Sequence, residues 1–577
     1  MSKFKNKVLL SGAEIIWECL LKEGVDTVFG YPGGAILPAY DALNNYSDKI
    51  HHVLVRHEQG ATHMADGYAR VSGKVGVAIA TSGPGAANMV TGIATAMMDS
   101  SPIVCITGQV PSAAIGSDAF QEMDISGAVI PVTKHSYLVM DAKDIAKTIK
   151  EAFAVARSGR PGPVLVDIPK DIQSQIIHFN YPEGPVRVPG LPLRKYPEVS
   201  DLKNAVKLIM ESKKPVILAG HGILISGASK EVSELAELVN IPIGWTLLGS
   251  GAIPSSHPLN MGMMGMHGEF SVNNAIQEAD LLIACGMRFD DRVTGNATTY
   301  SPNSKKIHIE IDPSEINKNI KVDLSIIGDL KTVLQQLNPM LTKKVETNWI
   351  DTLTTWQEQS SKRDIINLKT KTLYAAQAIH DIWAETNGDA IVVSDVGQHQ
   401  MLEAQYYKHD EPNTLLTSGG LGTMGFSLPA AIGASFFRRD KSIWVIVGDG
   451  SIQMTITELA TAVQENTNIN IAIINNGYLG MVRQWQQLFY DERYKETPIS
   501  SPDYVKLSEA YGLKGLRVKK RSEISDAIKL AESINGPVLV EFIVEQHDMV
   551  YPMVATGSDL NDMISRPVHD QFQESEM

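Results

Sequence analysis

An aspartate between two glycines ends an apolar run in the stretch WVIVGDGS, residues 444–451. A second apolar run, INIAII (469–474), ends in the asparagine pair Asn475 and Asn476. The intervening residues leave room for one helix, expected at about 456–466, and one returning strand. In a parallel sheet, that connection brings Asp449 and Asn476 together at the carboxyl ends of adjacent strands, where open α/β sheets bind ligands.

These side chains have the chemistry of a magnesium and diphosphate site. Carboxylate and amide oxygens are hard donors of the kind that Mg²⁺ takes, often together with phosphate oxygens. The glycines allow the backbone to approach a phosphate, and the N-terminus of the following helix adds positive potential. Each fragment alone would most often be an ordinary turn or loop. Their combination after two apolar strands favours the metal and diphosphate interpretation.

The elements that must position these residues are strands rich in Val and Ile, which alternate with helical stretches. Continuous apolar strands of this kind predict parallel sheets that are covered by helices on both faces. Ser11 and Glu14 form an S-x-x-E capping box at the start of the first expected helix. The expected strands lie at 75–81, 102–108, 163–169, 215–220, 281–286, 390–395 and 469–474.

Two stretches have the composition of linkers: the proline-rich residues 181–200 and the polar residues 337–364, which lack a strand pattern. They divide the chain into three domains of ordinary size, and the predicted fold class is α/β with three doubly wound parallel sheets. The expected bounds are 1–188 for the N-terminal domain, 193–340 for the central domain and 370–577 for the C-terminal domain.

The first and third domains share a sequence pattern. Residues 75–97 and 443–463 both run from a strand through a Gly-x-Gly turn into a helix with Met four residues on, followed by Ala-Thr-Ala. This similarity predicts an internal duplication. Pro84 stands where Asp449 stands, so only the third domain can offer a side-chain ligand at that turn.

Composition restricts the class of protein. Acidic residues outnumber basic ones by 65 to 51 in the 577 residues, and the net charge of −14 argues against a nucleic acid or an anionic membrane as partner. Cys19, Cys105 and Cys285 form no CxxC pattern, which indicates a reducing compartment without a disulfide framework or a zinc site. Because neither a signal peptide nor a membrane-spanning run is evident, a cytoplasmic location is expected.

The Gly-Asp-Gly turn with the later Asn-Asn pair resembles the signature of thiamine diphosphate enzymes. The resemblance implies that Asp449, Asn476 and the backbone carbonyl of Tyr478 bind Mg²⁺, which holds the diphosphate of the cofactor. It also implies that Glu58 bonds the aminopyrimidine ring and promotes loss of the thiazolium C2 proton. By itself Glu58 would be interpreted as a solvated carboxylate beside basic neighbours. In relatives this glutamate acts across a subunit boundary, so at least a homodimer is expected.

Further stretches, which together cover nearly the whole chain, are similar to the acetohydroxyacid synthases, the acetolactate synthases of branched-chain amino acid biosynthesis. They are FGYPGGAILP (29–38), TSGPGAANMVTGIATAMMDSSP (81–102), GSDAFQEMD (116–124), SGRPGPVLVDIPKD (158–171), GMRFDDRVTGN (286–296), TSGGLGTMGFSLPAAIGA (417–434) and NNGYLGMVRQWQQLFY (475–490). The implied reaction removes CO₂ from pyruvate and joins the remaining two-carbon unit to a second pyruvate or to 2-oxobutanoate. The products are 2-acetolactate and 2-aceto-2-hydroxybutanoate.

The same resemblance assigns further residues to the thiamine site. Beside Glu58, the implied catalytic positions are Gly34, Gln121 and Lys170. Contacts with the cofactor are implied for Gly397, Gln398, His399, Gly422, Met424, Gly448, Gly450, Ser451 and Met481. Met424 would lie between the two rings of the cofactor and keep it bent, although a buried Met at 424 or 481 could equally fill the core.

The central domain is expected to bind FAD as a structural cofactor. MGMMGMHG (261–268) and RFDDR (288–292) support this resemblance, whereas the glycines of 218–227 are not specific by themselves. The charges of RFDDR could otherwise form a solvated cluster. The implied flavin contacts are Arg160, Gly220, His221, Gly222, Thr246, Leu247, Met266, His267, Gly286, Arg288, Asp290, Arg292, Glu310 and Asp329.

Arg288 and Trp485 are the implied acceptor residues. The guanidinium can bind the acceptor carboxylate, and the indole would contact its alkyl group and favour 2-oxobutanoate, although Trp485 could also simply pack on a helix face. The expected partners are small 2-oxoacids and further copies in a homodimer or homotetramer. The sequence leaves open whether there is a separate regulatory small subunit, which biosynthetic relatives commonly have. The alternatives are a pyruvate oxidase or decarboxylase, and a non-catalytic thiamine- or flavin-binding regulator. The joint presence of Glu58, Asp449 and Asn476 argues against the regulator.

Overall fold

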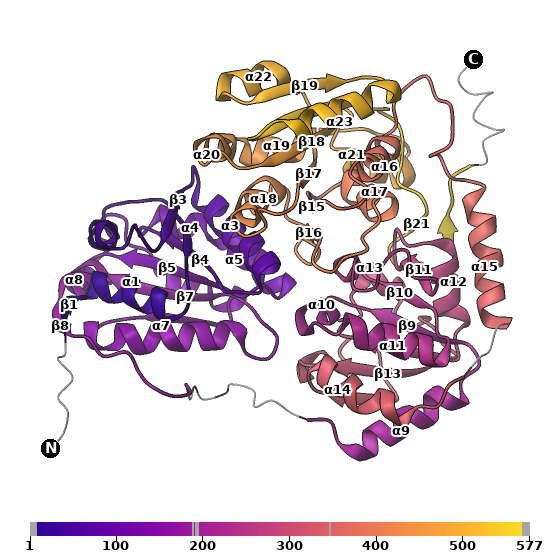
Figure 1. Ribbon diagram of the computed structural model, residues 1–577, viewed down its shortest axis with the longest axis horizontal. Coiled ribbons are helices and arrows are strands. Elements are labelled where there is room, and N and C mark those ends of the chain that lie inside the picture. Colours follow the sequence, from indigo (N-terminus) through magenta and orange to yellow (C-terminus); the bar gives the residue numbers. More distant parts are fainter. Residues whose placement is uncertain (1–7, 187, 189, 191–195, 345–347, 568–577) are drawn as a thin grey trace.

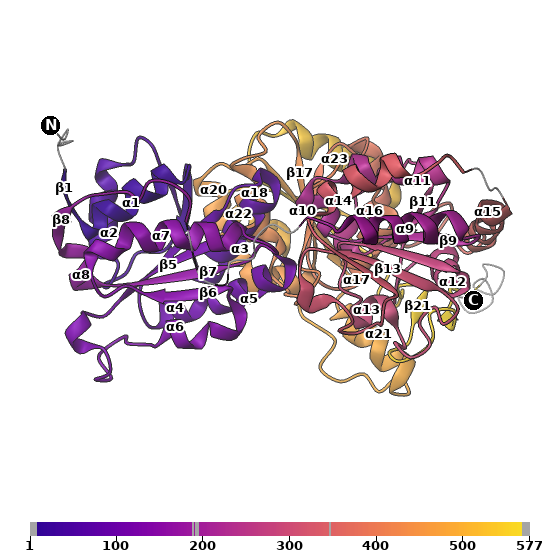
Figure 2. The same ribbon diagram turned by 90° about the horizontal axis from the view of Figure 1, so that it is seen from below.

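The computed structural model describes residues 8–186, 188, 190, 196–344 and 348–567, and within them it contains three six-stranded sheets (Figure 1). Every strand pairing inside these three sheets is parallel. Helices lie on both faces of the sheets, as the two orthogonal views show (Figures 1 and 2). The predicted α/β class with three doubly wound sheets is therefore confirmed.

The N-terminal sheet has the strand order β3-β2-β4-β5-β7-β6. Its strands are β2 (Thr27–Gly30), β3 (His51–Leu54), β4 (Gly76–Ala80), β5 (Ile103–Gln109), β6 (His135–Leu138) and β7 (Val164–Pro169). Its helices are α1 (Gly12–Lys22), α2 (Leu37–Ala42), α3 (Glu58–Ser72), α4 (Pro84–Asn88), α5 (Val90–Asp99), α6 (Ile125–Ala128), α7 (Ala142–Arg157) and α8 (Lys170–Ser174). A short antiparallel pair, β1 (Leu9–Ser11) and β8 (Ile176–His178), closes this part of the chain.

The central sheet has the order β11-β10-β9-β12-β13-β14. Its strands are β9 (Pro215–Ala219), β10 (Ile243–Trp245), β11 (Asn260–Met263), β12 (Leu281–Cys285), β13 (Lys305–Glu310) and β14 (Leu324–Ile327). The accompanying helices are α9 (Val199–Glu211), α10 (Gly222–Ser226), α11 (Ser229–Val239), α12 (Phe270–Glu278), α13 (Asp291–Thr294), α14 (Leu330–Leu337) and α15 (Asn348–Ser361).

The C-terminal sheet has the order β16-β15-β17-β18-β20-β19. Its strands are β15 (Ile391–Ser394), β16 (Leu415–Thr417), β17 (Ile443–Gly448), β18 (Ile469–Asn475), β19 (Lys514–Val518) and β20 (Val538–Ile543). Its helices are α16 (Ala375–Glu385), α17 (Gln398–Tyr406), α18 (Ser427–Ser435), α19 (Asp449–Thr455), α20 (Leu459–Gln464), α21 (Gly480–Phe489), α22 (Tyr504–Tyr511) and α23 (Ile524–Ser533). A short pair, β21 (Met553–Val554) and β22 (Met563–Ile564), follows.

Local sequence signals explain how these elements form. Each predicted apolar stretch contains a strand, and all six residues of β17 are buried, as a central strand covered on both faces requires. The predicted capping box also exists: Ser11 Oγ accepts the amide of Glu14 at 3.2 Å, and the Glu14 carboxylate accepts the amide of Ser11 at 2.8 Å. Such a cap stabilises a helix by about 1 kcal/mol.

The N-terminal and C-terminal sheets have the same topology, as the predicted duplication requires. If β2 to β7 are matched in order with β15 to β20, the two strand orders become identical, whereas the central sheet follows another order. The equivalent helices α3 and α18 pack against each other between the two domains (Figure 1). Gly67 and Gly433 allow this close approach, because a Cβ would lie 2.1 Å from the carbonyl oxygen of Ala430 at the first position and 2.0 Å from that of Met64 at the second.

The structure corrects two details of the sequence interpretation. The helix expected at about 456–466 is three consecutive helical segments, because α19 begins at Asp449 itself and a 3₁₀ turn, Ile456–Glu458, joins it to α20. The polar stretch 337–364 is not only a linker, since it contains α15, whose Trp349 and Leu353 are buried. Parts of both linkers, and residues 568–577, lie outside the described residues. The predicted domain bounds enclose the three sheets and stay our proposal.

No described helix combines the length and apolar character needed to cross a membrane.

The central domain contacts both of its neighbours. Arg160 of the N-terminal domain pairs with Glu315 at 3.1 Å, and Gln405 of α17 donates to the carbonyl oxygen of His267 at 3.0 Å. Since α3 also packs against α18, each of the three domains contacts the other two.

Candidate active site

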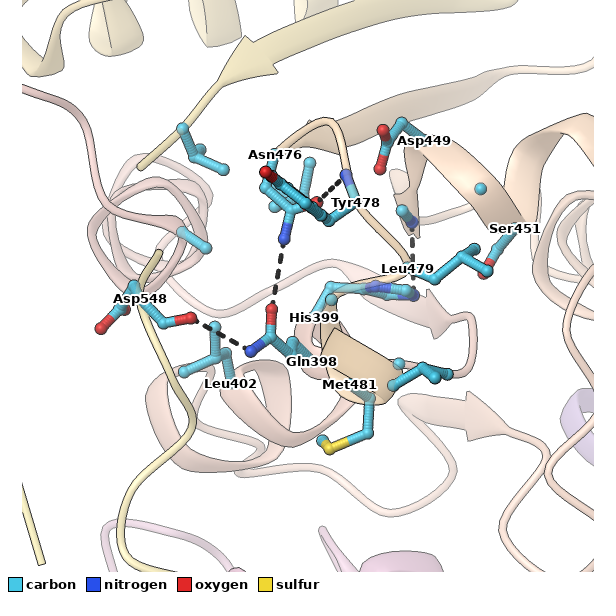
Figure 3. A pocket seen from close by; sticks show the side chains of 18 of the residues that line it. Gln398, His399, Leu402, Asp449, Ser451, Asn476, Tyr478, Leu479, Met481 and Asp548 are labelled. Atoms are coloured by element: carbon cyan, nitrogen blue, oxygen red, sulfur yellow. Dashed lines mark hydrogen bonds between the residues drawn. The ribbon is translucent and has the colours of Figure 1, made fainter. Parts of the chain in front are cut away.

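The carboxyl ends of β17 and β18 bring Asp449 and Asn476 into one small cavity, as the strand pattern predicts (Figure 3). Asp449 is the first residue of α19 and is only 1% exposed. Asn476 directly follows β18, and its side chain is held from two sides: Oδ1 accepts the amide of Tyr478 at 3.1 Å, and Nδ2 donates to Gln398 Oε1 at 3.2 Å. The amide is thereby oriented before any ligand arrives.

Burial makes the Asp449 carboxylate costly unless a cation is near. Removal from water raises the pKa of Asp449 to about 6, and hydrogen bonds from backbone amides and from Ser501, whose hydroxyl lies 3.3 Å from Oδ2, only partly offset this. No ion pair among the described residues reaches this carboxylate. A buried carboxylate of this kind fits a metal cation.

The donor set suits Mg²⁺. It offers one carboxylate, one amide oxygen and the carbonyl of Tyr478, all of them hard oxygen ligands. The loop that carries this carbonyl is fixed, because Ile499 donates to Gly477 and Leu479 donates to Thr497 through backbone bonds of 3.0 and 2.8 Å. The described residues contain no group of three or more His, Cys, Asp or Glu that could hold a metal.

The floor of this cavity is suited to an anion. The helices α17 and α19 both begin there, at Gln398 and Asp449, so that their N-termini face the same space. Burial lowers the pKa of His399 to about 4, and the neutral ring accepts the amide of Gly448 through Nε2 at 3.3 Å. Ser451 also lines the cavity, and its hydroxyl donates to the carbonyl oxygen of Val396 at 3.1 Å.

A second, much larger cavity of about 1300 Å³ lies between the central domain and its two neighbours. It collects nearly all of the residues that the resemblance assigned to flavin. These are Arg160, His221, Gly222, Thr246, Leu247, Met266, His267, Gly286, Arg288, Asp290, Arg292, Glu310 and Asp329. Gly220 lies behind this wall, where a Cβ would come within 2.2 Å of the carbonyl oxygen of Gly286.

The two cavities share a wall. Val396, Gly397, Met424, Met481 and Val482 line both of them, while Gly422 lines only the larger one. Trp485 of α21 lines the larger cavity together with Arg288, although the two residues belong to different domains. The indole packs against the ring of Phe489, with centroids 5.1 Å apart. The structure therefore places the two predicted acceptor residues in one space that borders the cavity of Asp449.

The four predicted catalytic residues of the N-terminal domain lie elsewhere. Among the described residues of this single chain, neither cavity is lined by Glu58, Gly34, Gln121 or Lys170. The first three gather instead at the carboxyl end of β4. A Cβ at Gly85 would lie 3.1 Å from Glu58 Oε1, one at Gly83 would meet the backbone of Gln121, and one at Gly33 would meet Thr81.

The Glu58 side chain is 9% exposed, and its Oε2 accepts a bond from Asn88 Nδ2 at 2.9 Å. At Gly34, a Cβ would have no described atom within 4 Å, so open space adjoins the backbone there. Lys170 begins α8, and Gln173 of the same helix donates to the carbonyl oxygen of Ala35 at 2.9 Å. The predicted site residues thus form two separate groups in this chain, which we name the half-site after β4 and the half-site after β17.

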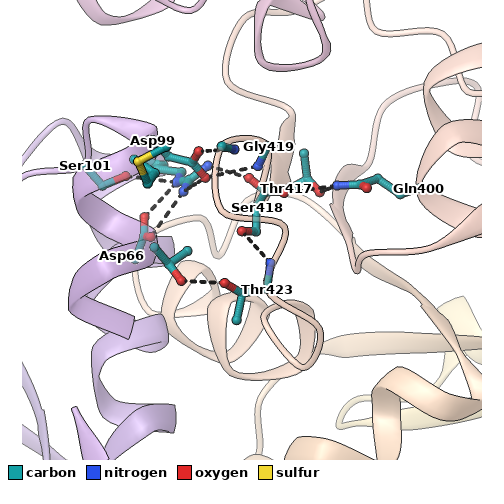
Figure 4. A network of polar contacts seen from close by, with 12 residues as sticks. Asp66, Asp99, Ser101, Gln400, Thr417, Ser418, Gly419 and Thr423 are labelled. Carbon is teal, nitrogen blue, oxygen red and sulfur yellow. Dashed lines mark hydrogen bonds and ion pairs between the residues drawn. The ribbon is translucent and has the colours of Figure 1, made fainter. Parts of the chain in front are cut away.

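A buried cluster that the sequence did not reveal joins the N-terminal domain to the loop 417–423 (Figure 4). Arg70 pairs with Asp66 at 2.7 Å and with Asp99 at 2.9 Å, and it donates to the carbonyl oxygen of Thr417 at 2.8 Å. Asp99 also accepts the amides of residues 419 and 420. The loop leads directly to Met424, so the cluster supports the wall that the two cavities share.

Comparison with known proteins gives the class of the chain. Models of the thiamine pyrophosphate enzymes match it in three blocks. The N-terminal TPP binding domain matches residues 10–128, the central domain matches residues 202–337, and the C-terminal TPP binding domain matches residues 395–542. The block that matches the C-terminal TPP binding domain includes Asp449 and Asn476.

Individual relatives narrow the class. The acetolactate synthase large subunit of Corynebacterium glutamicum is 48% identical over 566 residues, which covers 96% of this chain and 90% of that protein. The acetolactate synthase of Mycobacterium bovis is 46% identical over 581 residues, 98% of this chain and 94% of its own length. The isozyme 3 large subunit of Escherichia coli is 43% identical over 573 residues, 96% of this chain and 98% of its own. The chain belongs to the acetolactate synthase family of thiamine pyrophosphate enzymes.

Proposed function

We propose that this chain is the catalytic subunit of an acetohydroxyacid synthase of branched-chain amino acid biosynthesis. It removes CO₂ from pyruvate and joins the two-carbon unit to a second pyruvate or to 2-oxobutanoate, giving 2-acetolactate or 2-aceto-2-hydroxybutanoate. The observation that supports this best is the shared wall between the cavity of Asp449 and the cavity of Arg288 and Trp485. A diphosphate site and an acceptor site are adjacent there.

Three cofactors belong to this proposal: thiamine diphosphate, Mg²⁺ and FAD. Bound thiamine diphosphate supplies the electron sink for decarboxylation of a 2-oxoacid. Asp449, Asn476 and the Tyr478 carbonyl would hold Mg²⁺, because they offer hard oxygens beside a buried charge that lacks a cation. The 1300 Å³ cavity has room for a flavin, and its lining from the central domain fits that ligand. Flavin fluorescence after denaturation of the purified protein tests this assignment, and a protein that releases no flavin would contradict it.

The diphosphate cavity is completed by a second copy of the chain. Its lining runs from Ala375 to Met549 and includes no residue of the N-terminal domain among those described. Glu58, Gly34, Gln121 and Lys170 would therefore serve the cavity of a partner, in a homodimer or homotetramer. Asn88 holds Glu58 Oε2, which leaves Oε1 to share a proton with the aminopyrimidine ring. Because the relatives are named large subunits, we also propose a separate regulatory small subunit.

The acceptor is selected at the larger cavity. The Arg288 guanidinium would pair with the carboxylate of the second 2-oxoacid. Trp485 would contact its alkyl group and favour 2-oxobutanoate, whose extra methylene adds apolar contact. Met424 and Met481 line both cavities, where they would exclude water between cofactor and acceptor.

Product identification by NMR tests this function. The purified protein would receive thiamine diphosphate, Mg²⁺ and FAD together with pyruvate and 2-oxobutanoate. We expect mostly 2-aceto-2-hydroxybutanoate. Acetyl phosphate or acetaldehyde would instead identify a pyruvate oxidase or decarboxylase and would overturn the acceptor site while leaving the cofactor site intact.

A further inference from the structure

One buried carboxylate outside both cavities holds the backbone that precedes Glu58. Glu458 closes the 3₁₀ turn after α19 and is 0% exposed. Its Oε1 accepts the amides of Arg56 and His57, each at 3.0 Å, and Oε2 lies 3.2 Å from the Arg56 amide. Thr461 donates to Oε2 at 2.7 Å. A side chain of the C-terminal domain thus binds two consecutive amides of the N-terminal domain.

The two bonded amides lie at the start of α3, next to Glu58. His57 is the N-cap of α3, and Glu58 is the first residue of that helix. The carboxylate lies beside the N-terminus of a 15-residue helix, where negative charge is favourable. Gly60 provides the room, since a Cβ there would lie 2.5 Å from Glu458 Oε1.

The contact is not an ordinary ion pair. The Arg56 guanidinium points to other acceptors, the carbonyl oxygen of Leu54 and Gln464 Oε1, each at 2.8 Å. Glu458 therefore acts on the backbone through directed hydrogen bonds, which fix position more narrowly than charge alone. Glu58 is the residue that directly follows this bonded backbone.

We propose that Glu458 is a positioning residue for Glu58. Its carboxylate fixes the backbone of residues 56–57, and Asn88 fixes Oε2 of Glu58 at the far end. Together they set where Oε1 lies when a partner subunit presents the cofactor. The inference rests on the proposed role of Glu58. It adds that the C-terminal domain of the same chain, and not only the N-terminal domain, determines the geometry of this catalytic carboxyl group.

Three variants separate geometry from charge. Glu458→Gln keeps an oxygen at the same reach for both amides but loses the charge, whereas Glu458→Asp keeps the charge and withdraws it by one methylene. Glu458→Ala loses both the charge and the oxygen acceptors. We expect kcat to fall about 100-fold in the Ala variant, as misplacement by about 1 Å can cause, with a clear loss in Asp and most activity retained in Gln. KM for pyruvate and cofactor affinity should stay close to the parent values.

The matched control is Glu465→Gln. Glu465 also reaches from the C-terminal domain to the N-terminal one, but it bonds the exposed His51 side chain at 2.8 Å and no backbone amide near Glu58. The kcat of Glu465→Gln should equal that of the parent protein. A second readout needs no cofactor: in the apoprotein, amide hydrogen exchange at residues 56 and 57 should accelerate in the Ala and Asp variants but not in Glu465→Gln.

The outcomes distinguish this inference from the proposed function. If Glu58→Gln is fully active, the role of Glu58 itself is wrong. If Glu58→Gln is inactive while Glu458→Asp and Glu458→Ala keep normal kcat, Glu458 does not position it. Loss of kcat in Gln but not in Asp would show that charge matters and would also overturn the proposal. Should the Ala variant fail to fold, the comparison of Gln with Asp still decides.

Discussion

Strands β4 and β17 occupy the same place in two sheets of the same topology, yet the turns after them differ in chemistry. After β4, Gly83 adopts a left-handed conformation with φ 59° and Pro84 begins a helix, with the backbone of Gln121 packed against the turn. After β17, Gly448 has an ordinary φ of −78° and Asp449 begins a helix with a buried carboxylate. The turn after β4 packs against the backbone of its own domain. The turn after β17 carries a buried carboxylate that has no cationic partner among the described residues.

The difference shows how one sheet topology can present two different kinds of chemistry. The turn after β17 offers oxygen ligands and helix N-termini, which suit a metal and a diphosphate. The turn after β4 offers Glu58 beside open backbone at Gly34, which suits the acid–base chemistry of an organic ring. Among the described residues of one chain, the cavity of Asp449 contains no residue of the turn after β4. Under the proposed function, each half-site is therefore completed by another copy.

The largest effect is expected from the half-site after β17. Asp449→Ala removes the buried carboxylate and with it the anchor for Mg²⁺, so binding of thiamine diphosphate in the presence of Mg²⁺ should become undetectable by calorimetry. Asp440→Ala, which removes an exposed partner of Arg438 just before the same strand, is the control and should bind normally. Unchanged affinity in the Asp449 variant would mean that this turn does not hold the metal.

The half-site after β4 should fail differently. Glu58→Gln keeps the size of the side chain but cannot exchange a proton, so turnover should fall by about 10²–10⁴-fold, the range for a lost acid–base group. Cofactor binding should persist, because no described residue of the diphosphate cavity changes. Single-turnover kinetics together with calorimetry measure both quantities. Near-normal turnover would contradict the assigned role.

Mixing the two inactive variants tests whether the two half-sites of one active site come from different subunits. A dimer of one Glu58→Gln chain and one Asp449→Ala chain contains one site with both residues intact if the half-sites come from different subunits. Random exchange should then restore about one quarter of the parent activity. If both half-sites belonged to one chain, the mixture would stay inactive.

Much of the difference between the two half-sites was predictable from the sequence, but some of their features were not. Asp449 and Asn476 follow apolar strands, and strand order alone brings them together. Nearly all of the residues that the resemblance assigned to flavin line one cavity. That α19 starts at Asp449 was missed, because a Gly-Asp-Gly sequence has turn composition and only the packing of the helix shows otherwise.

The buried charges were missed for a different reason. Asp66, Arg70 and Asp99 lie in or at the ends of helices, where charged residues normally indicate a solvated face. The same is true of Glu458, whose partners are backbone amides about 400 residues away along the chain. Such contacts depend on how domains pack, so no local pattern reports them.

A variant of Arg70 tests whether the buried cluster that anchors the 417–423 loop supports both the fold and cofactor binding. Arg70→Met would leave the carboxylates of Asp66 and Asp99 buried without their cation, which costs about 3–5 kcal/mol when one partner of a buried pair is removed. We expect a markedly lower denaturation midpoint and weaker binding of thiamine diphosphate, since the 417–423 loop loses its anchor. Arg438→Met, which breaks an exposed pair, should change stability by less than about 1 kcal/mol. Equal midpoints for both variants would show that the Arg70 cluster does not stabilise the fold.

The smallest effect should separate acceptor choice from catalysis. Under the proposed function, acceptor choice belongs with the half-site after β17, because Trp485 and Arg288 line the cavity that shares a wall with the cavity of Asp449. Trp485→Leu should therefore erode the preference for 2-oxobutanoate over pyruvate by about 10-fold or more, the scale on which a pocket senses one methylene, while the rate with pyruvate alone changes little. Competition between the two acceptors, with both products quantified by NMR, measures this ratio. An unchanged ratio would move acceptor choice to the other half-site, where Gln121 becomes the residue to change.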